Sequence, residues 1–351
     1  MDVRTILDQA TGHGASDIFI IAGRPLSYRV KGNMEALDDY KLLPNDTHEF
    51  VTGLYTLAER DISEFERTGD DDFSFAVPGL ARFRVNAYRQ RGSLAAVVRV
   101  VSFDIPDWQS IHIPREVMDL ADVSHGLILI TGTAGSGKST TQACIIDRIN
   151  RTRDCHIITL EDPIEFLHRN QRSIVSQREI AIDTADYLSA LRACLRQAPD
   201  VILLGEMRDA DTIRTAITAA ETGHTVIATL HTKGAVNAID RVVDSFPSTH
   251  QAQIRMLLST VLRTVVSQQM LPSKEGSMVP AFEIMHMNSA IRGMIRDNKN
   301  HQINNAIAAG RAEGMVTMDQ SIAALYRAGV IARDVALDFA DHPEQLTRQL
   351  G

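Results

Sequence analysis

The residues with the most specific chemistry lie at positions 132 to 139, where the sequence fits the G-x-x-x-x-G-K-[ST] phosphate-binding pattern without a mismatch. Glycines in this pattern let the backbone fold tightly and aim its N–H groups at phosphate oxygens. Lys138 would reach the β- and γ-phosphates, and the Ser139 hydroxyl would bind Mg²⁺. We therefore predict an ATP site formed by Gly132, Thr133, Ala134, Gly135, Ser136, Gly137, Lys138, Ser139 and Thr140.

The segments on either side of this loop predict the elements that hold it. Residues 127–130 form a short apolar run, which is typical of a buried parallel strand, and residues 140–149 carry apolar side chains at helical spacing. The loop therefore joins a buried strand to the start of a helix. The N-terminus of that helix adds partial positive charge, which favours bound phosphate.

Glu206 is the predicted catalytic base. A second apolar run covers residues 201–204, and Gly205 separates this run from Glu206. Because the carboxyl ends of parallel strands open on the ligand site of such sheets, Glu206 is placed to orient the attacking water. The alternative is an acid that only caps the next helix, and the phosphate loop favours the catalytic role.

Two further groups of polar residues lie at predicted strand ends. Glu161, Asp162 and Glu165 would repel one another unless a cation or solvent separates them, so we predict a role in binding Mg²⁺, with an exposed acidic turn as the alternative. His224 and His231 flank another apolar run. No further ligands lie nearby at zinc spacing, so His231 is instead predicted to hydrogen-bond a phosphate.

A predicted strand over residues 82–90 alternates between apolar and basic side chains. Phe83 and Val85 lie on one face, and Arg82 and Arg84 lie on the other. The arginines could simply face solvent. In an ATPase they have another possible use, which is to deliver positive charge to the nucleotide of a neighbouring subunit.

The chain divides into two predicted domains. Residues 1–102 predict a small α+β domain, and residues 103–114, with prolines at positions 106 and 114, predict a linker. Apolar strands alternate with helices in residues 115–351, which predicts an α/β domain whose parallel sheet is covered on both faces. From about residue 250, including Gln251 to Met270, the periodicity predicts a helical C-terminal region.

Composition limits the possible functions. The net charge is −8, whereas a nucleic-acid-binding chain usually has a strongly basic domain or stripe. The three cysteines form no C-x-x-C pair and are predicted to be core thiols of a reducing compartment. No apolar run approaches the ~20 residues of a membrane span, and the N-terminus lacks a signal peptide. We therefore expect a cytoplasmic protein that binds no nucleic acid.

The motifs together resemble those of the secretion-ATPase superfamily, most closely the PilT-type retraction ATPases of type IV pili. The resemblance implies that Glu161, Asp162 and Glu165 form the family's Asp box, that Glu206 belongs to its Walker B motif, and that His224 and His231 form its His box. It rests on residues 131–141, 158–166, 205–209 and 219–232.

The resemblance also implies a fold and an assembly. A PAS-like N-terminal domain would join a RecA-like P-loop domain, and six copies would form a ring with ATP between subunits. Arg82 and Arg84 match family arginines that reach a neighbour's phosphates, and Arg192 and Arg196 lie in the arginine-bearing helix before the Glu206 strand.

Residues 290–296, Ala-Ile-Arg-Gly-Met-Ile-Arg, resemble a C-terminal signature of the retraction subfamily, which implies a role in coupling ATP turnover to retraction. The expected function is thus a hexameric motor that disassembles pilin for twitching motility. It would act with a platform protein, peripheral to the inner face of the cytoplasmic membrane. The alternatives are an export ATPase of a type IV secretion system and, from another class, a nucleic-acid translocase. A binding module with an inactive ATP site is disfavoured by the intact Lys138, Glu165 and Glu206.

Overall fold

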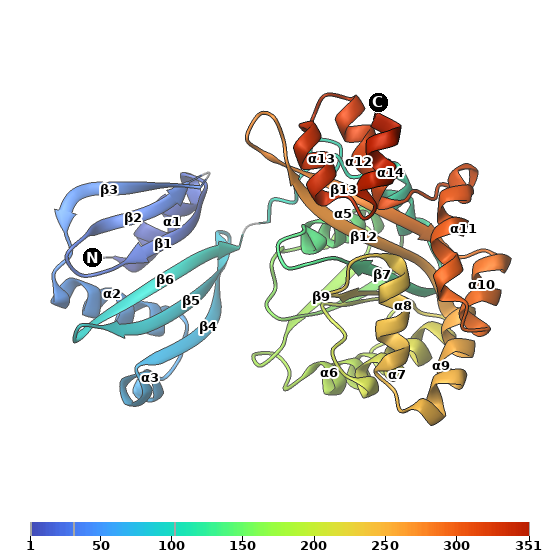
Figure 1. The fold of residues 1–351 in the computed structure, drawn as a ribbon. Helices are drawn as coiled ribbons and strands as arrows, with labels where there is room; N and C mark the ends of the chain where they lie inside the picture. The colour runs from blue at the N-terminus through green and yellow to red at the C-terminus, as the bar shows by residue number, and fades with distance from the viewer. Residues whose placement is uncertain (1, 31, 102, 351) are drawn as a thin grey trace. The chain divides into compact units, whose positions relative to one another are not determined.

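The computed structural model describes residues 2–30, 32–101 and 103–350 (Figure 1). The chain forms two compact units, Met1–Asp104 with Glu165–Leu167, and Ile105–Ile164 with His168–Gly351. The boundary at Asp104 differs from the predicted linker. Ile105, Trp108 and Ile111 pack against the core of the second unit, and Ile113 is buried within it, because these side chains are too apolar to remain in solvent.

The first unit is a six-stranded antiparallel sheet in the order β3-β2-β1-β6-β5-β4. Its strands are β1 (Ala15–Ile20), β2 (Pro25–Val30), β3 (Asn33–Lys41), β4 (Asp70–Val77), β5 (Ala81–Gln90) and β6 (Ser93–Val101), and its helices are α1 (Val3–Gly12), α2 (Pro44–Leu57) and α3 (Ser63–Thr68).

The alternation predicted for β5 determines which face of this sheet is buried. Phe83 and Val85 are fully buried in the core of the unit, whereas Arg82 and Arg84 are half-buried on the other face. Phe83 lies 5.5 Å, between ring centroids, from Phe75 of the neighbouring strand β4, so an aromatic pair fixes the register of the two strands.

The second unit is built on a seven-stranded sheet in the order β13-β12-β7-β11-β10-β8-β9, in which only the β12–β13 pairing is antiparallel among the described strands. Its strands are β7 (Gly126–Thr131), β8 (His156–Glu161), β9 (Ile174–Glu179), β10 (Val201–Leu204), β11 (Thr225–Leu230), β12 (Leu262–Pro272) and β13 (Met278–His286). Every residue of β7, β10 and β11 is buried, as expected for strands covered on both faces.

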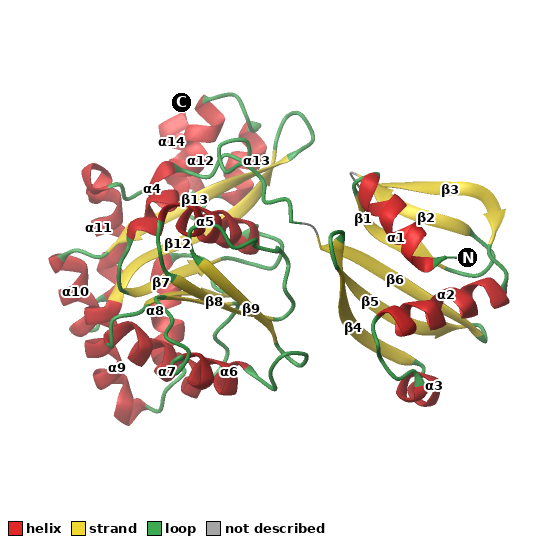
Figure 2. Cartoon of the chain, turned by 180° about the vertical axis from the view of Figure 1, so that it is seen from behind, coloured by secondary structure: helices red, strands yellow, loops and turns green. Residues whose placement is uncertain are grey.

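Different helices cover the two faces of this sheet (Figure 2). Leu127 and Leu129 of β7 pack on the side of α7, α8 and α9, whereas Ile128 and Ile130 pack on the side of α5. The helices are α4 (Arg115–Met118), α5 (Lys138–Thr152), α6 (Tyr187–Cys194), α7 (Ala210–Glu221), α8 (Ala235–Asp244), α9 (Ser248–Val261), α10 (Ser289–Arg296), α11 (Ile303–Ala309), α12 (Met318–Arg327), α13 (Arg333–Phe339) and α14 (Pro343–Leu350), with short 3₁₀ segments at Asp119–Asp122, Asn300–Gln302 and Gly310–Glu313.

One secondary-structure prediction is wrong. The helix expected over Gln251 to Met270 ends at Val261, and the chain continues as β12 in the central sheet. Val265 and Val266 are both fully buried, one on each face of the sheet, and such a strand has no alternating pattern that would distinguish it from a buried helix. The helical C-terminal part is therefore confirmed only for the residues after β13, which form α10 to α14.

The cysteines are free thiols, as predicted. Cys144 and Cys194 are buried, and burial raises the pKa of the Cys144 thiol to about 12 and that of the Cys194 thiol to about 11. Such thiols stay protonated and behave as small apolar side chains. In the described part of the chain, no helix is long and apolar enough to cross a bilayer.

Candidate active site

The phosphate loop follows the carboxyl end of β7 and leads directly into α5. Gly132 has a φ of 144°, and a Cβ at this position would lie 2.3 Å from the carbonyl oxygen of Gln268. Gly137 has a φ of 86°, and a Cβ there would lie 2.7 Å from the Gln268 side-chain amide. The loop therefore closes against β12, and only glycine fits at these two positions.

Lys138 and Ser136 show that the loop is shaped around an anion. The Lys138 ammonium donates to the carbonyl oxygens of Gly132 and Thr133 at 3.0 and 2.8 Å, so the positive charge is held inside the loop. The Ser136 hydroxyl is buried and has no hydrogen-bond partner among the described residues. A buried hydroxyl without a partner beside a lysine fits a bound phosphate, which accepts from both groups.

The sheet order brings the other predicted groups to the same edge. β7, β11, β10 and β8 are consecutive and parallel, so their carboxyl ends lie side by side. These ends lead to the phosphate loop, His231, Glu206 and the pair Glu161–Asp162, in that order. The edge therefore combines a phosphate site, an imidazole and three carboxylates.

The Glu206 carboxylate is in contact with two basic side chains, Arg208 and His231. Its side chain is 9% exposed, with one carboxylate oxygen 2.5 Å from an Arg208 guanidinium nitrogen and the other 3.3 Å from Nε2 of His231. The pairing with Glu206 raises the pKa of the Arg208 guanidinium, which therefore remains charged. The predicted base and the predicted phosphate-sensing histidine are thus in direct contact.

Glu161 is fixed at the end of β8 by neutral donors. The hydroxyl of Thr159 donates to Oε1 of Glu161 at 2.6 Å, and the side-chain amide of Gln177 on β9 donates to the same oxygen at 3.3 Å. Asp162 is exposed. Among the described residues, no three acidic, histidine or cysteine side chains are grouped closely enough to hold a metal ion.

The acidic residues therefore differ from the expected cluster of three direct Mg²⁺ ligands. Asp162 and Glu165 are both exposed, and Glu161 is held by Thr159 and Gln177. Mg²⁺ usually keeps several waters and takes only one or two protein ligands together with substrate phosphates. A closed set of carboxylates is therefore not required at this edge.

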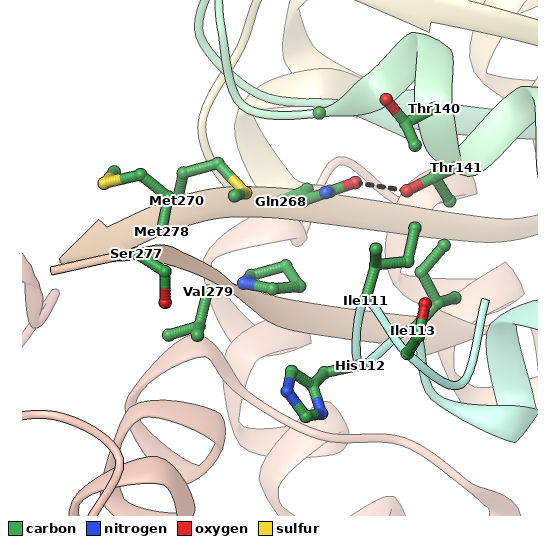
Figure 3. Close-up of a pocket in the computed structure, with 13 residues that line it drawn as sticks. Ile111, His112, Ile113, Thr140, Thr141, Gln268, Met270, Ser277, Met278 and Val279 are labelled. Atoms are coloured by element: carbon green, nitrogen blue, oxygen red, sulfur yellow. Dashed lines mark hydrogen bonds between the residues drawn. The ribbon is translucent and has the colours of Figure 1, made fainter. Parts of the chain in front are cut away.

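A cavity of about 380 Å³ adjoins the start of α5 (Figure 3). Its wall is mainly apolar and includes Ile111, Met270 and Val279, while Thr140 and Thr141 enter from α5. His112, which has a φ of 59°, lies on the opposite side from these threonines. An apolar cavity next to a phosphate site fits the base and ribose of a nucleotide.

Several predicted binding residues lie away from this edge. His224 precedes β11, and its backbone oxygen accepts from Gly126 at the start of β7, so it lies at the opposite end of the strands from the phosphate loop. The membership of His224 in a nucleotide-binding His box, which the resemblance implies, therefore stays a prediction. Arg192 and Arg196 are exposed at the end of α6.

Four residues at the site were not predicted from the sequence: Thr141, Tyr187, Arg208 and Gln268. Thr141 bonds to Gln268, which lies on a strand that the sequence analysis assigned to a helix. Tyr187 begins α6 in the second unit, and its buried hydroxyl has its pKa raised by burial and then by Glu206, Asp162 and Glu161. Of these four residues, only Arg208 could have been placed at the site from the local sequence, because it lies two residues after Glu206.

The chain is similar to characterised proteins over nearly its full length. Residues 1–335 match the family model of the type II/IV secretion system protein. The type IV pilus retraction ATPase PilT of Pseudomonas aeruginosa is 42% identical over 98% of this chain and 99% of its own. A twitching motility protein of Neisseria gonorrhoeae is 42% identical over 91% of this chain and 85% of its own. A crystal structure of the pilus retraction motor PilT with bound ADP superimposes with a TM-score of 0.90, at 43% identity and 99% coverage of both chains.

Proposed function

Because this chain belongs to the type II/IV secretion system protein family, we propose that it is a P-loop ATPase that uses ATP hydrolysis to retract type IV pili. The observation that carries this proposal is the 42% identity to a pilus retraction ATPase over 98% of the chain. The sheet edge supports it, because the phosphate loop, Glu206 and His231 supply the groups that ATP hydrolysis requires.

Each residue at the edge has a part in the proposed reaction. Lys138 and the backbone N–H groups of the loop hold the β- and γ-phosphates, and the cavity beside α5 holds the base and ribose. Ser139 would hold Mg²⁺, which would supply positive charge to stabilise the transferred phosphoryl group. Glu206 orients a water and accepts its proton, while His231 hydrogen-bonds both Glu206 and the phosphate.

The proposed active form is a homohexameric ring. Arg82 and Arg84 belong to the first unit, and Arg192 and Arg196 are exposed at the end of α6. We assign all four to the nucleotide of a neighbouring subunit. In the ring, the first unit forms the PAS-like domain and the second unit forms the RecA-like domain. The ring works against a platform protein at the cytoplasmic face of the inner membrane. Glu161, Asp162 and Glu165 would supply carboxylate oxygens for Mg²⁺.

Two variants test the ATPase part of this proposal. Glu206→Gln should bind ATP normally but turn it over about 100-fold more slowly, since phosphate contacts remain while the base is lost. Lys138→Ala should lose nucleotide affinity as well. Bound nucleotide and phosphate release are measured on both. Parental turnover by Glu206→Gln would remove it from the catalytic role.

A cell-based test addresses retraction. Cells in which Glu206→Gln replaces the parental protein should display surface pili but fail to twitch, because assembly continues without retraction. Normal twitching with an inactive ATPase would contradict the proposed motor function.

A further inference from the structure

Both oxygens of the Glu206 carboxylate contact a side-chain nitrogen. Arg208 contacts one oxygen at 2.5 Å, and His231 contacts the other at 3.3 Å. A general base must present a lone pair to the water that it deprotonates. Arg208 therefore competes with a water for the lone pairs of one of the two oxygens.

Arg208 is the more exposed of the two partners. Its side chain is 72% exposed, whereas that of Glu206 is 9% exposed. Among the described residues, Arg208 makes its single polar side-chain contact with Glu206. A long exposed side chain held at one point can leave and return without disturbing the buried acid.

The backbone around Arg208 is fixed by other groups. Met207 is buried, and its N–H donates to the carbonyl oxygen of Thr229 at 3.1 Å. Asp209 caps α7 by accepting from the N–H of Thr212 at 2.8 Å and from its hydroxyl at 2.7 Å. The Arg208 side chain is therefore not needed to shape this turn, which leaves its contact with Glu206 as its structural role.

We propose that Arg208 is a latch, a positioning residue that restrains basal ATP turnover by occupying the Glu206 carboxylate until it is drawn away. This inference rests on the proposed function. On release, Glu206 takes a proton from the attacking water while the water oxygen bonds to the γ-phosphorus. The bond from that phosphorus to the bridging oxygen breaks, and ADP leaves with the electron pair.

The latch predicts a specific kinetic signature for Arg208→Ala. The turnover number should rise by roughly threefold to tenfold, in keeping with the loss of one exposed charge-assisted contact, while KM for ATP stays unchanged. Arg208→Lys keeps the positive charge and should behave like the parent. Arg151→Ala is the matched control, because Arg151 is also exposed and paired, with Asp147 at 2.7 Å, on the surface of α5.

Salt provides a readout that a purely structural role would not change. Raising KCl from about 0.05 to 0.5 M screens an exposed ion pair, so turnover by the parent should rise with salt and turnover by Arg208→Ala should not. Oligomeric mass and thermal unfolding are measured on each variant, and both should match the parent.

The outcomes separate this inference from the proposed function. If parental turnover depends on Lys138 and Arg208→Ala is no faster than the parent, the latch is overturned and the ATPase stands. If the parent shows no Lys138-dependent turnover, both are overturned. Faster turnover by Arg208→Ala, with unchanged KM and no salt response, supports the latch.

Discussion

The hydroxyl of Thr141 donates a hydrogen bond of 2.8 Å to Oε1 of Gln268, and both side chains are buried. The two residues are 127 positions apart in the chain. The bond joins the first turn of α5 to strand β12, beside the cavity that adjoins the phosphate loop (Figure 3). The Gln268 backbone also lies against Gly132, so one residue of β12 supports both ends of the loop.

We expect Gln268→Leu and Thr141→Val each to weaken ATP binding by about tenfold, because each leaves a buried polar partner unpaired. The double variant should lose little more ATP affinity than either single variant. The coupling energy between Thr141 and Gln268 should therefore be about 1 kcal/mol. Nucleotide titrations on the four proteins measure this coupling. Thr140→Val is the control, and additive losses would show that the bond does not support the loop.

Gly132→Ala should abolish nucleotide binding, because the new Cβ would lie 2.3 Å from the Gln268 carbonyl oxygen and the backbone cannot yield without moving β12. Gly135→Ala is the informative comparison. Its φ is also positive, at 75°, but no atom lies within 4 Å of the new Cβ, so only backbone strain of about 1 kcal/mol is added. ATP affinity and thermal unfolding compare the two, and equal losses would contradict the steric argument.

The phosphate loop and Glu206 could be located from the sequence because each has a local signature beside a short apolar run. Gln268 could not, because its role comes from sheet order: β12 lies next to β7, although β12 begins 130 positions after Gly132 of the loop. A motif within one segment contains no information about which later strand will lie beside it. The same limit explains Tyr187, which begins a helix that packs against strand β8.

Replacing Arg292 or Arg296 with alanine should change the stability of the protein by different amounts, although both residues lie on α10 within residues 290–296. Arg292 donates to the carbonyl oxygens of Ser259 and Thr260 in the last turn of α9, so Arg292→Ala should cost about 1–2 kcal/mol of unfolding free energy. Arg296 lies 3.5 Å from the carboxylate of the adjacent Asp297, and its side chain is 53% exposed. Arg296→Ala should therefore change the free energy of unfolding by less than about 0.5 kcal/mol.

Arg296→Ala is therefore the clean test of coupling between ATP turnover and retraction. We expect normal ring mass and ATP turnover but no twitching. Arg292→Ala alone cannot separate coupling from helix packing. Normal twitching by Arg296→Ala would exclude this side chain from the coupling step.

His168 should make the stability of the protein depend on pH. Burial lowers the pKa of its imidazole to about 4, with only partial compensation from Asp147, and Nδ1 is buried without a partner among the described residues. Below the unfolded pKa of about 6.5, the unfolded chain binds a proton that the folded chain does not. Stability should therefore fall between pH 6.5 and pH 4 and level off below that.

The expected loss between pH 7.5 and pH 5 is on the order of 2 kcal/mol. Urea unfolding at both pH values measures it. His168→Gln should reduce this dependence, whereas replacement of the exposed His250 by Gln should retain it. An unchanged pH dependence in His168→Gln would assign the effect to other groups.

The pairing of β12 with β13 has a mechanical consequence. The two strands are hydrogen-bonded in register over nine residue pairs, from Thr264–His286 to Pro272–Met278. β13 packs against α12, and β12 carries Gln268 to the phosphate loop. Because hydrogen bonds join the two strands along their length, we expect a displacement of α12 to be passed through this ribbon to Gln268 at the phosphate loop.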